Sequence, residues 1–169
     1  MASVYISIGS NIDREKNIRL CMNKLRQQFP DIIFSTVYET AAVGFKGDPF
    51  YNLAAGFETE WDVYRLDNYF KQLEKEQHRI HHPTPNQSSP SSKVFKSRTL
   101  DVDLLLYDDL ILQPEKDLPR KEILKYPFVL FPLGEIAPNV IHPEQQKTIG
   151  TLCKESTLTI KTMKAIHLD

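Results

Sequence analysis

The segment from Leu100 to Tyr107 constrains the fold most, because it reads as a strand that carries two acidic side chains. Asp101 and Asp103 are two positions apart, so both carboxylates project from one face, with their bases about 6–7 Å apart. Leu104 and Leu106 are expected to continue this register as apolar positions. Like charges on a half-buried face repel and are costly to desolvate, and a bound cation removes both penalties. The segment alone leaves two interpretations open: a solvated strand end, or a metal–phosphate site.

Magnesium would suit such a site, because proteins commonly hold this ion with one or two carboxylates and with substrate phosphates. Arg98 lies just before the strand. A guanidinium group matches the geometry of a phosphate, so Arg98 is a natural phosphate clamp.

The composition is that of an ordinary globular domain. The chain has 169 residues, of which 41% are hydrophobic and 25% are charged, and this predicts a single domain over residues 1–169. A formal net charge of −1 gives no field that would recruit nucleic acid or an anionic membrane. Two cysteines are too few for a disulfide framework, and neither a membrane-spanning apolar run nor a basic leader is apparent. We therefore expect a cytoplasmic protein without nucleic-acid or membrane partners.

Strand-like and helix-like apolar periods alternate along the chain. Strands are predicted at Val4–Ile8, Ile32–Tyr38, Phe50–Phe57 and Leu100–Tyr107, and helices at Asp13–Gln28 and Asp62–Arg79. Further elements are predicted as a hairpin partner at Leu110–Leu112, helices at Phe128–Ile136 and Thr148–Lys154, and a strand at Leu158–Met163. The order β-α-β-β-α-β, with additions at the C-terminal end, predicts an α+β fold of the ferredoxin-like kind. Its sheet is mostly antiparallel, with helices packed on it.

The region of about residues 81–97 is rich in serine and proline and is expected to form a mobile lid. Just before and within it, His78, His81 and His82 would share one face of a helix, a spacing that could bind zinc or nickel. A polar helix end is the favoured interpretation, because no cysteine or acidic fourth ligand lies nearby and Pro83 ends the helix.

Several short strings, taken together, carry a resemblance to a known family. They are Gly9-Ser10-Asn11, Glu39-Thr40 with Gly44, the FYNLA string from Phe50, Glu74 with Arg79, RTLDVDL from Arg98 and FVLFPLGEIAP from Phe128. In this order and spacing the chain resembles the 6-hydroxymethyl-7,8-dihydropterin pyrophosphokinase family of folate biosynthesis, over about residues 2–143. Members transfer pyrophosphate from ATP to the hydroxymethyl group of the pterin and release AMP, using two Mg²⁺ ions.

The resemblance implies roles for individual residues. Asp101 and Asp103 would hold both metal ions between the triphosphate and the accepting hydroxyl, with Arg98 and Arg79 completing the catalytic group. The pterin site would consist of Thr40, Val43, Phe50, Asn52 and Phe128. In it the pterin would stack between the two aromatic rings while the Asn52 amide bonds to the pyrimidine edge. The nucleotide would be contacted by Glu74, Arg79, Arg98, Arg120 and Lys121.

The chain also departs from the family pattern. Arg120 stands where the family usually has a histidine that contacts ATP, Tyr126 stands where it tends to have an arginine, and His81 replaces a second arginine before the lid. Lys121 and Lys125, with Arg120, restore positive charge nearby. The lid also looks longer than usual.

These departures keep two alternatives open. One is a divergent family member that binds pterin and nucleotide with weak or lost transfer. The other is a nucleic-acid module, since RNA-recognition domains share the element order, although the net charge of −1 and the absence of an R-G-F-G-F-like string argue against it. A P-loop enzyme is disfavoured, because no G-x-x-x-x-G-K-[ST] string occurs. We expect the protein to act as a monomer.

Overall fold

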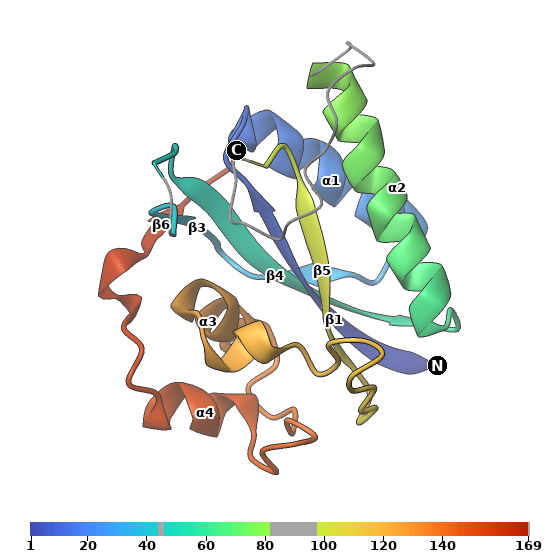
Figure 1. Ribbon diagram of the computed structural model, residues 1–169, viewed down its shortest axis with the longest axis vertical. Helices are drawn as coiled ribbons and strands as arrows, with labels where there is room; N and C mark the ends of the chain where they lie inside the picture. The colour runs from blue at the N-terminus through green and yellow to red at the C-terminus, as the bar shows by residue number, and fades with distance from the viewer. Residues whose placement is uncertain (44–45, 82–97, 169) are drawn as a thin grey trace.

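The computed structural model describes residues 1–43, 46–81 and 98–168, and only the backbone of residues 79–81 (Figure 1). The predicted lid therefore lies outside the described residues, apart from the backbone of His81, and so do Gly44 and His82. The elements, in chain order, are β1 (Ala2–Ser10), α1 (Arg14–Gln28), β2 (Ile33–Phe34), β3 (Val37–Thr40), β4 (Phe50–Thr59), α2 (Val63–His81), β5 (Asp101–Tyr107), the 3-10 helix η1 (Lys121–Leu124), α3 (Pro127–Ile136), α4 (Ile149–Glu155), the 3-10 helix η2 (Ile160–Thr162) and β6 (Lys164–Ile166).

The strands form one antiparallel sheet in the order β5-β1-β4-β3-β6, with the short β2 also paired to β4. Helices α1 and α2 cover one face, and α3 covers the other, with α4 packed on α3 (Figure 1). This confirms the predicted α+β fold, with a β-α-β-β-α-β core and C-terminal additions. Within the described residues, no helix combines the length and apolar character needed to cross a membrane.

The sheet separates two apolar cores. Alternate residues of β1, such as Ile6 and Ile8, are fully buried under α1 and α2 with Phe70. On the opposite face, Leu130 and Leu133 of α3 close the second core. The period of two along the central strands therefore supplies apolar residues to both helical layers.

A bulge in β5 places Leu106, but not Leu104, on the face of the acidic pair. Tyr5 pairs with Leu106 and Ile6 pairs with Leu104, so Leu105 is the extra residue. Leu104 belongs to the core under α1 and α2, whereas Leu105 and Leu106 both belong to the core under α3. The expectation that Leu104 continues the face of the aspartates was wrong, since strict alternation places it on the opposite face.

Two predicted strands were also wrong. The segment Leu110–Leu112 forms no strand, and Leu112 makes only an isolated bridge to Leu118. The segment Leu158–Met163 contains η2, and the strand that joins the sheet, β6, follows it and pairs with β3.

The predicted strand Ile32–Tyr38 is divided into β2 and β3 by Ser35 and Thr36. The Ser35 hydroxyl accepts a hydrogen bond from the Ala54 amide of β4 (2.8 Å). The Thr36 amide and hydroxyl instead donate to the Glu135 carboxylate of α3, at 2.8 and 2.6 Å. The strand breaks where its backbone turns to bind α3.

Candidate active site

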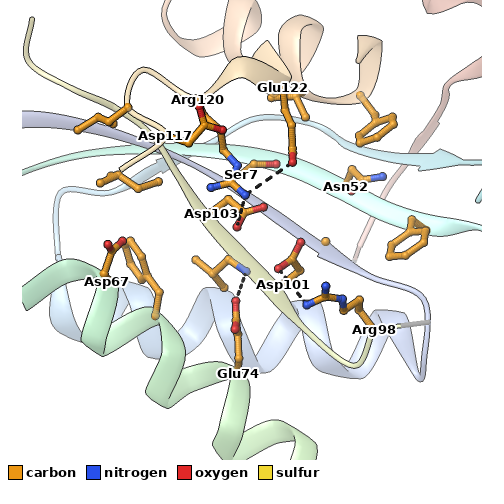
Figure 2. Close-up of a pocket in the computed structure, with 18 of the residues that line it drawn as sticks. Ser7, Asn52, Asp67, Glu74, Arg98, Asp101, Asp103, Asp117, Arg120 and Glu122 are labelled. Carbon is orange, nitrogen blue, oxygen red and sulfur yellow. Dashed lines mark hydrogen bonds and ion pairs between the residues drawn. The ribbon is translucent and has the colours of Figure 1, made fainter. Parts of the chain in front are cut away.

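A cavity of about 600 Å³ lies along the β5 edge of the sheet, between α2 and the segment 114–122 (Figure 2). The sheet contributes Ser7, Asn52, Asp101 and Asp103, and the first residues of α3 contribute Phe128. Because β5 is an edge strand, some of its backbone groups lack a neighbouring strand. The Glu74 carboxylate of α2 accepts a hydrogen bond from one of them, the Val102 amide, at 2.9 Å.

The two aspartates lie side by side on the face of β5 that carries the cavity. Asp103 pairs with Ser7 and Asp101 with Gly9 across the ladder to β1, which confirms that the carboxylates share one face. Each aspartate lies near a different arginine. The nitrogen–oxygen distance is 3.2 Å from Arg120 to Asp103 and 3.8 Å from Arg98 to Asp101.

Burial raises the pKa of Asp103 well above its ordinary value, and the Asp101 carboxylate raises it further. Arg120 lowers the pKa of Asp103 but does not offset these two effects. Burial likewise raises the pKa of Glu74 to about 7, although the hydrogen bond from Val102 favours its ionised form. The cavity therefore contains carboxyl groups that gain stability when a cation approaches.

The donor set fits a magnesium ion that shares its coordination with a substrate. Two carboxylates on one strand face supply hard oxygen ligands. In the part of the chain that the structure describes, no group of three or more His, Cys, Asp or Glu residues is arranged to hold a metal. An ion bound here would take its other ligands from phosphate oxygens and water, as magnesium commonly does.

The Gly9-Ser10-Asn11 string at the end of β1 holds the start of β5 in place. The Ser10 hydroxyl donates to the Thr99 carbonyl at 2.6 Å. The backbone N–H of Asn11 donates to the Arg98 carbonyl at 3.0 Å, and the Asn11 side-chain oxygen accepts from the backbone N–H of Arg98 at 2.6 Å. These bonds place the Arg98 side chain, which lines the cavity, directly before the acidic pair.

The other end of the cavity has an amide group and two aromatic rings. The Asn52 side chain is buried and donates a 2.6 Å hydrogen bond to the Thr40 hydroxyl. This bond orients the amide, so its oxygen and second N–H remain available as acceptor and donor. Phe50 and Phe128 both line the cavity.

Val43 also lines the cavity, and its side chain is exposed. Tyr126, which stands at a position of departure from the family pattern, stacks on Phe128 with ring centres 5.0 Å apart. All five predicted pterin residues therefore line the same cavity.

The predicted nucleotide residues are only partly brought together. Glu74, Arg98 and Arg120 line the cavity. Lys121 begins η1 with an exposed side chain, away from the cavity lining. Arg79 lies on α2, and its side chain is outside the described residues.

Sequence reasoning missed six charged groups at the cavity: Asp67, Lys71, Glu115, Lys116, Asp117 and Glu122. Glu122 lies 3.6 Å from the Arg120 guanidinium. Lys116 forms an ion pair with Asp67 of α2, which links the loop after β5 to that helix. Glu122 could have been found from its spacing to Arg120, but no local signal relates Lys116 to a partner on a distant helix.

Comparison with known proteins shows which family the chain resembles. The chain matches the family described as 7,8-dihydro-6-hydroxymethylpterin-pyrophosphokinase over residues 5–138. It is 34% identical over 163 residues to the 2-amino-4-hydroxy-6-hydroxymethyldihydropteridine pyrophosphokinase of Aquifex aeolicus, covering 94% of each chain. It is 30% identical over 149 residues to the protein of the same name from Porphyromonas gingivalis, covering 85% of this chain and 96% of that protein.

A solved structure shows the same fold. The chain superposes with a TM-score of 0.68 on Plasmodium falciparum HPPK-DHPS, at 13% identity, covering 99% of this chain and 47% of that one. The extent of the family match and the identity to full-length relatives lead to one conclusion: the chain belongs to the 7,8-dihydro-6-hydroxymethylpterin-pyrophosphokinase family.

Proposed function

We propose that the protein transfers pyrophosphate from ATP to the hydroxymethyl group of 6-hydroxymethyl-7,8-dihydropterin, releasing AMP, as a step of folate biosynthesis. The observation that carries the proposal is one cavity with the acidic pair Asp101 and Asp103 in its wall and with Asn52, Phe50 and Phe128 at one end. A flat, hydrogen-bonding ring and a charged polyphosphate require these two kinds of surroundings.

The pterin end would fix the acceptor. Stacking against Phe50 and Phe128 would hold the ring plane, contributing about 0.5–1.5 kcal/mol beyond area burial. The Asn52 amide, oriented by Thr40, would pair with the donor and acceptor groups of the pyrimidine edge. Positioning two reactants in this way removes much of the entropic barrier to a reaction between them.

The phosphate end would bind and stabilise the transferring group. Two Mg²⁺ ions, held by Asp101 and Asp103 with substrate oxygens, would supply the positive charge that phosphoryl transfer requires. Arg98 and Arg120 can each present a planar fork of N–H donors to phosphate oxygens. Attack of the pterin hydroxyl oxygen on the β-phosphorus would form one P–O bond while the bond from that phosphorus to the α,β-bridging oxygen breaks. AMP would leave with the bridging oxygen, and the hydroxyl proton would pass to water.

The direct test is to incubate the protein with ATP, Mg²⁺ and the hydroxymethyl pterin and to measure AMP. AMP is expected in proportion to pterin consumed. Absence of AMP above a protein-free blank, with pterin still bound, would favour the divergent binding protein.

Two neutral variants test the acidic pair. We expect Asp101→Asn and Asp103→Asn each to reduce AMP formation by at least about a hundredfold, since each loses a metal ligand. Asp31→Asn, in an exposed turn, is the matched control and should retain full turnover. Normal turnover in Asp101→Asn would refute the metal assignment.

We also propose that the protein works as a cytoplasmic monomer. Light scattering coupled to size exclusion should give the mass of one chain, and a dimer mass would contradict this.

A further inference from the structure

Arg120 lies between the carboxylates of Asp103 and Glu122 in the wall of the cavity (Figure 2). One guanidinium nitrogen is 3.2 Å from Asp103 Oδ1 and 3.6 Å from Glu122 Oε1. Its backbone amide donates to the Leu105 carbonyl of β5 at 3.0 Å, which fixes the residue beside the strand of the aspartates. Its side chain is 21% exposed, so solvent screens these contacts only partly.

The hydrogen bonding of this guanidinium is incomplete. Its Nε atom is buried, and no acceptor among the described residues meets it. A buried donor without an acceptor is unfavourable by about 1–3 kcal/mol. A structural ion pair normally satisfies all of its buried donors, so this arrangement leaves the guanidinium with bonding capacity for a further anionic group.

Arg98 is held differently. It lies 3.8 Å from Asp101 with 43% of its side chain exposed, so it interacts weakly with that carboxylate. Of the two aspartates, Asp103 is the one with a close positive partner, and that partner contacts one of the two carboxylate oxygens, Oδ1.

We infer that Arg120 is a built-in counter-cation of Asp103 that competes with the metal for this carboxylate and transfers to the phosphates when the nucleotide binds. The inference rests on the proposed function, because it takes the metal and the nucleotide from it. Arg120 then links the binding of the two ligands. Without nucleotide, it holds Asp103 and disfavours a bare ion. With nucleotide, the phosphates satisfy its donors and release Asp103 to the metal.

This arrangement makes metal and nucleotide binding cooperative. The affinity for metal should rise when nucleotide is present, and the affinity for nucleotide should rise by the same factor when metal is present. Part of that cooperativity would exist in any enzyme that binds a metal–nucleotide complex. The part that depends on Arg120 can be measured by removing its charge.

The experiment measures the binding of Mg²⁺ by calorimetry and of Mn²⁺ by electron paramagnetic resonance, with and without α,β-methylene ATP. Without nucleotide, Arg120→Met and Arg120→Gln should bind the ion about tenfold more tightly than wild type, because Asp103 is then free. With the analogue bound, the neutral variants and wild type should bind the ion equally tightly. The cooperativity between metal and nucleotide should therefore be about tenfold smaller in the variants.

Two variants control for charge. Arg19→Met removes the same charge from an exposed ion pair with Glu15 and should leave the metal affinity within about twofold of wild type. Arg120→Lys keeps a cation near Asp103, so its affinity for the metal ion should stay within about threefold of the wild-type affinity. Thermal unfolding of each variant verifies that it is folded. If Arg120→Met does not fold, Arg120→Gln alone provides the test of the neutral side chain.

The proposal is overturned if both neutral variants bind the bare ion no more tightly than Arg19→Met, because Arg120 would then be a phosphate contact only. Failure of the proposed function gives a different pattern: wild type would bind no ion even with the analogue, and no AMP would form. The binding measurements require no turnover, so the two failures are distinguishable.

Discussion

Glu74 shows how a single residue adapts to the exposed edge of a sheet. Its carboxylate binds the Val102 amide on β5 from the facing helix α2. Burial raises its pKa to about 7, and the nearby Asp101 adds to the shift while the Val102 hydrogen bond opposes it. Burial therefore makes the folded protein more stable with Glu74 protonated, although the hydrogen bond from Val102 by itself favours the ionised carboxylate.

The shift predicts a pH dependence of stability. Between the ordinary value of 4.5 and about 7, the folded protein holds this proton more strongly than the unfolded chain, so stability falls as pH rises through that window. Glu74→Gln keeps an acceptor for Val102 without the charge. We expect it to be about 1–2 kcal/mol more stable than wild type at pH 8, after allowance for solvent screening, and nearly equal at pH 4.5.

Urea unfolding at the two pH values measures this difference. Burial lowers the pKa of His142, which makes stability rise with pH, but that residue is present in both proteins and cancels in the comparison. An equal difference at both pH values would contradict the prediction.

Gly9 controls the orientation of Asn52 across the β1–β4 ladder. The two residues are register partners, and a Cβ atom at Gly9 would lie 2.8 Å from Asn52 Oδ1. Gly9→Ala must therefore displace the amide that we assign to the pterin. We expect pterin affinity to fall at least about tenfold, with nucleotide affinity within about twofold of wild type.

A double-mutant cycle tests the mechanism of this loss. Asn52→Ala should reduce pterin affinity similarly, and Gly9→Ala added to it should reduce affinity little further, because both act through the same amide. Additive losses would mean that Gly9 acts by another route. Calorimetry with the pterin substrate gives all four affinities.

At the scale of elements, periodicity predicted the helices and central strands well, and it failed where a distant contact decides the local backbone. The Leu158–Met163 segment has apolar residues suited to a strand, yet the chain joins the sheet only at β6, where β3 offers a free edge. Glu135 of α3 interrupts the predicted second strand by binding Thr36. Neither contact leaves a pattern within its own segment.

The contact between α3 and α4 depends on a small residue. A Cβ atom at Gly134 of α3 would lie 2.5 Å from the Cys153 sulfur of α4. Gly134→Ala should push the helices apart and reduce the free energy of unfolding by about 1–3 kcal/mol. Adding Cys153→Ala removes the sulfur and should recover most of this loss, as measured by urea unfolding. Absence of recovery in the double variant would mean that the clash is with another group.

At the scale of the whole molecule, one sheet is shared by two helical layers. The α1–α2 layer and the α3 layer bury opposite faces of the same central strands, so loss of either layer exposes the sheet. This arrangement favours cooperative unfolding, which is what the predicted single domain requires.

Trp61 provides a probe of one layer. It is the single tryptophan of the chain, and its ring packs edge-on against Phe29 at 5.3 Å and Tyr69 at 5.5 Å. Its fluorescence and the far-ultraviolet circular dichroism should report the same urea midpoint. Gly134→Ala, in the other layer, should shift both midpoints equally. A fluorescence midpoint that stays unchanged while the dichroism becomes biphasic would show two separately folding units.

The sequence by itself determined the order of the main elements, the shared face of Asp101 and Asp103, and the family to which the strings around Asn52 and Arg98 pointed. These features depend on the spacing of apolar and polar residues along the chain and on motifs of a few neighbouring residues. Only the tertiary structure decided that Arg120 contacts Asp103, that Glu74 caps Val102 and that a bulge at Leu105 changes the face of the next leucine. Each of these contacts joins segments that are far apart in the sequence. The burial of side chains between these segments determines both the geometry of the cavity and the charge state of its carboxyl groups.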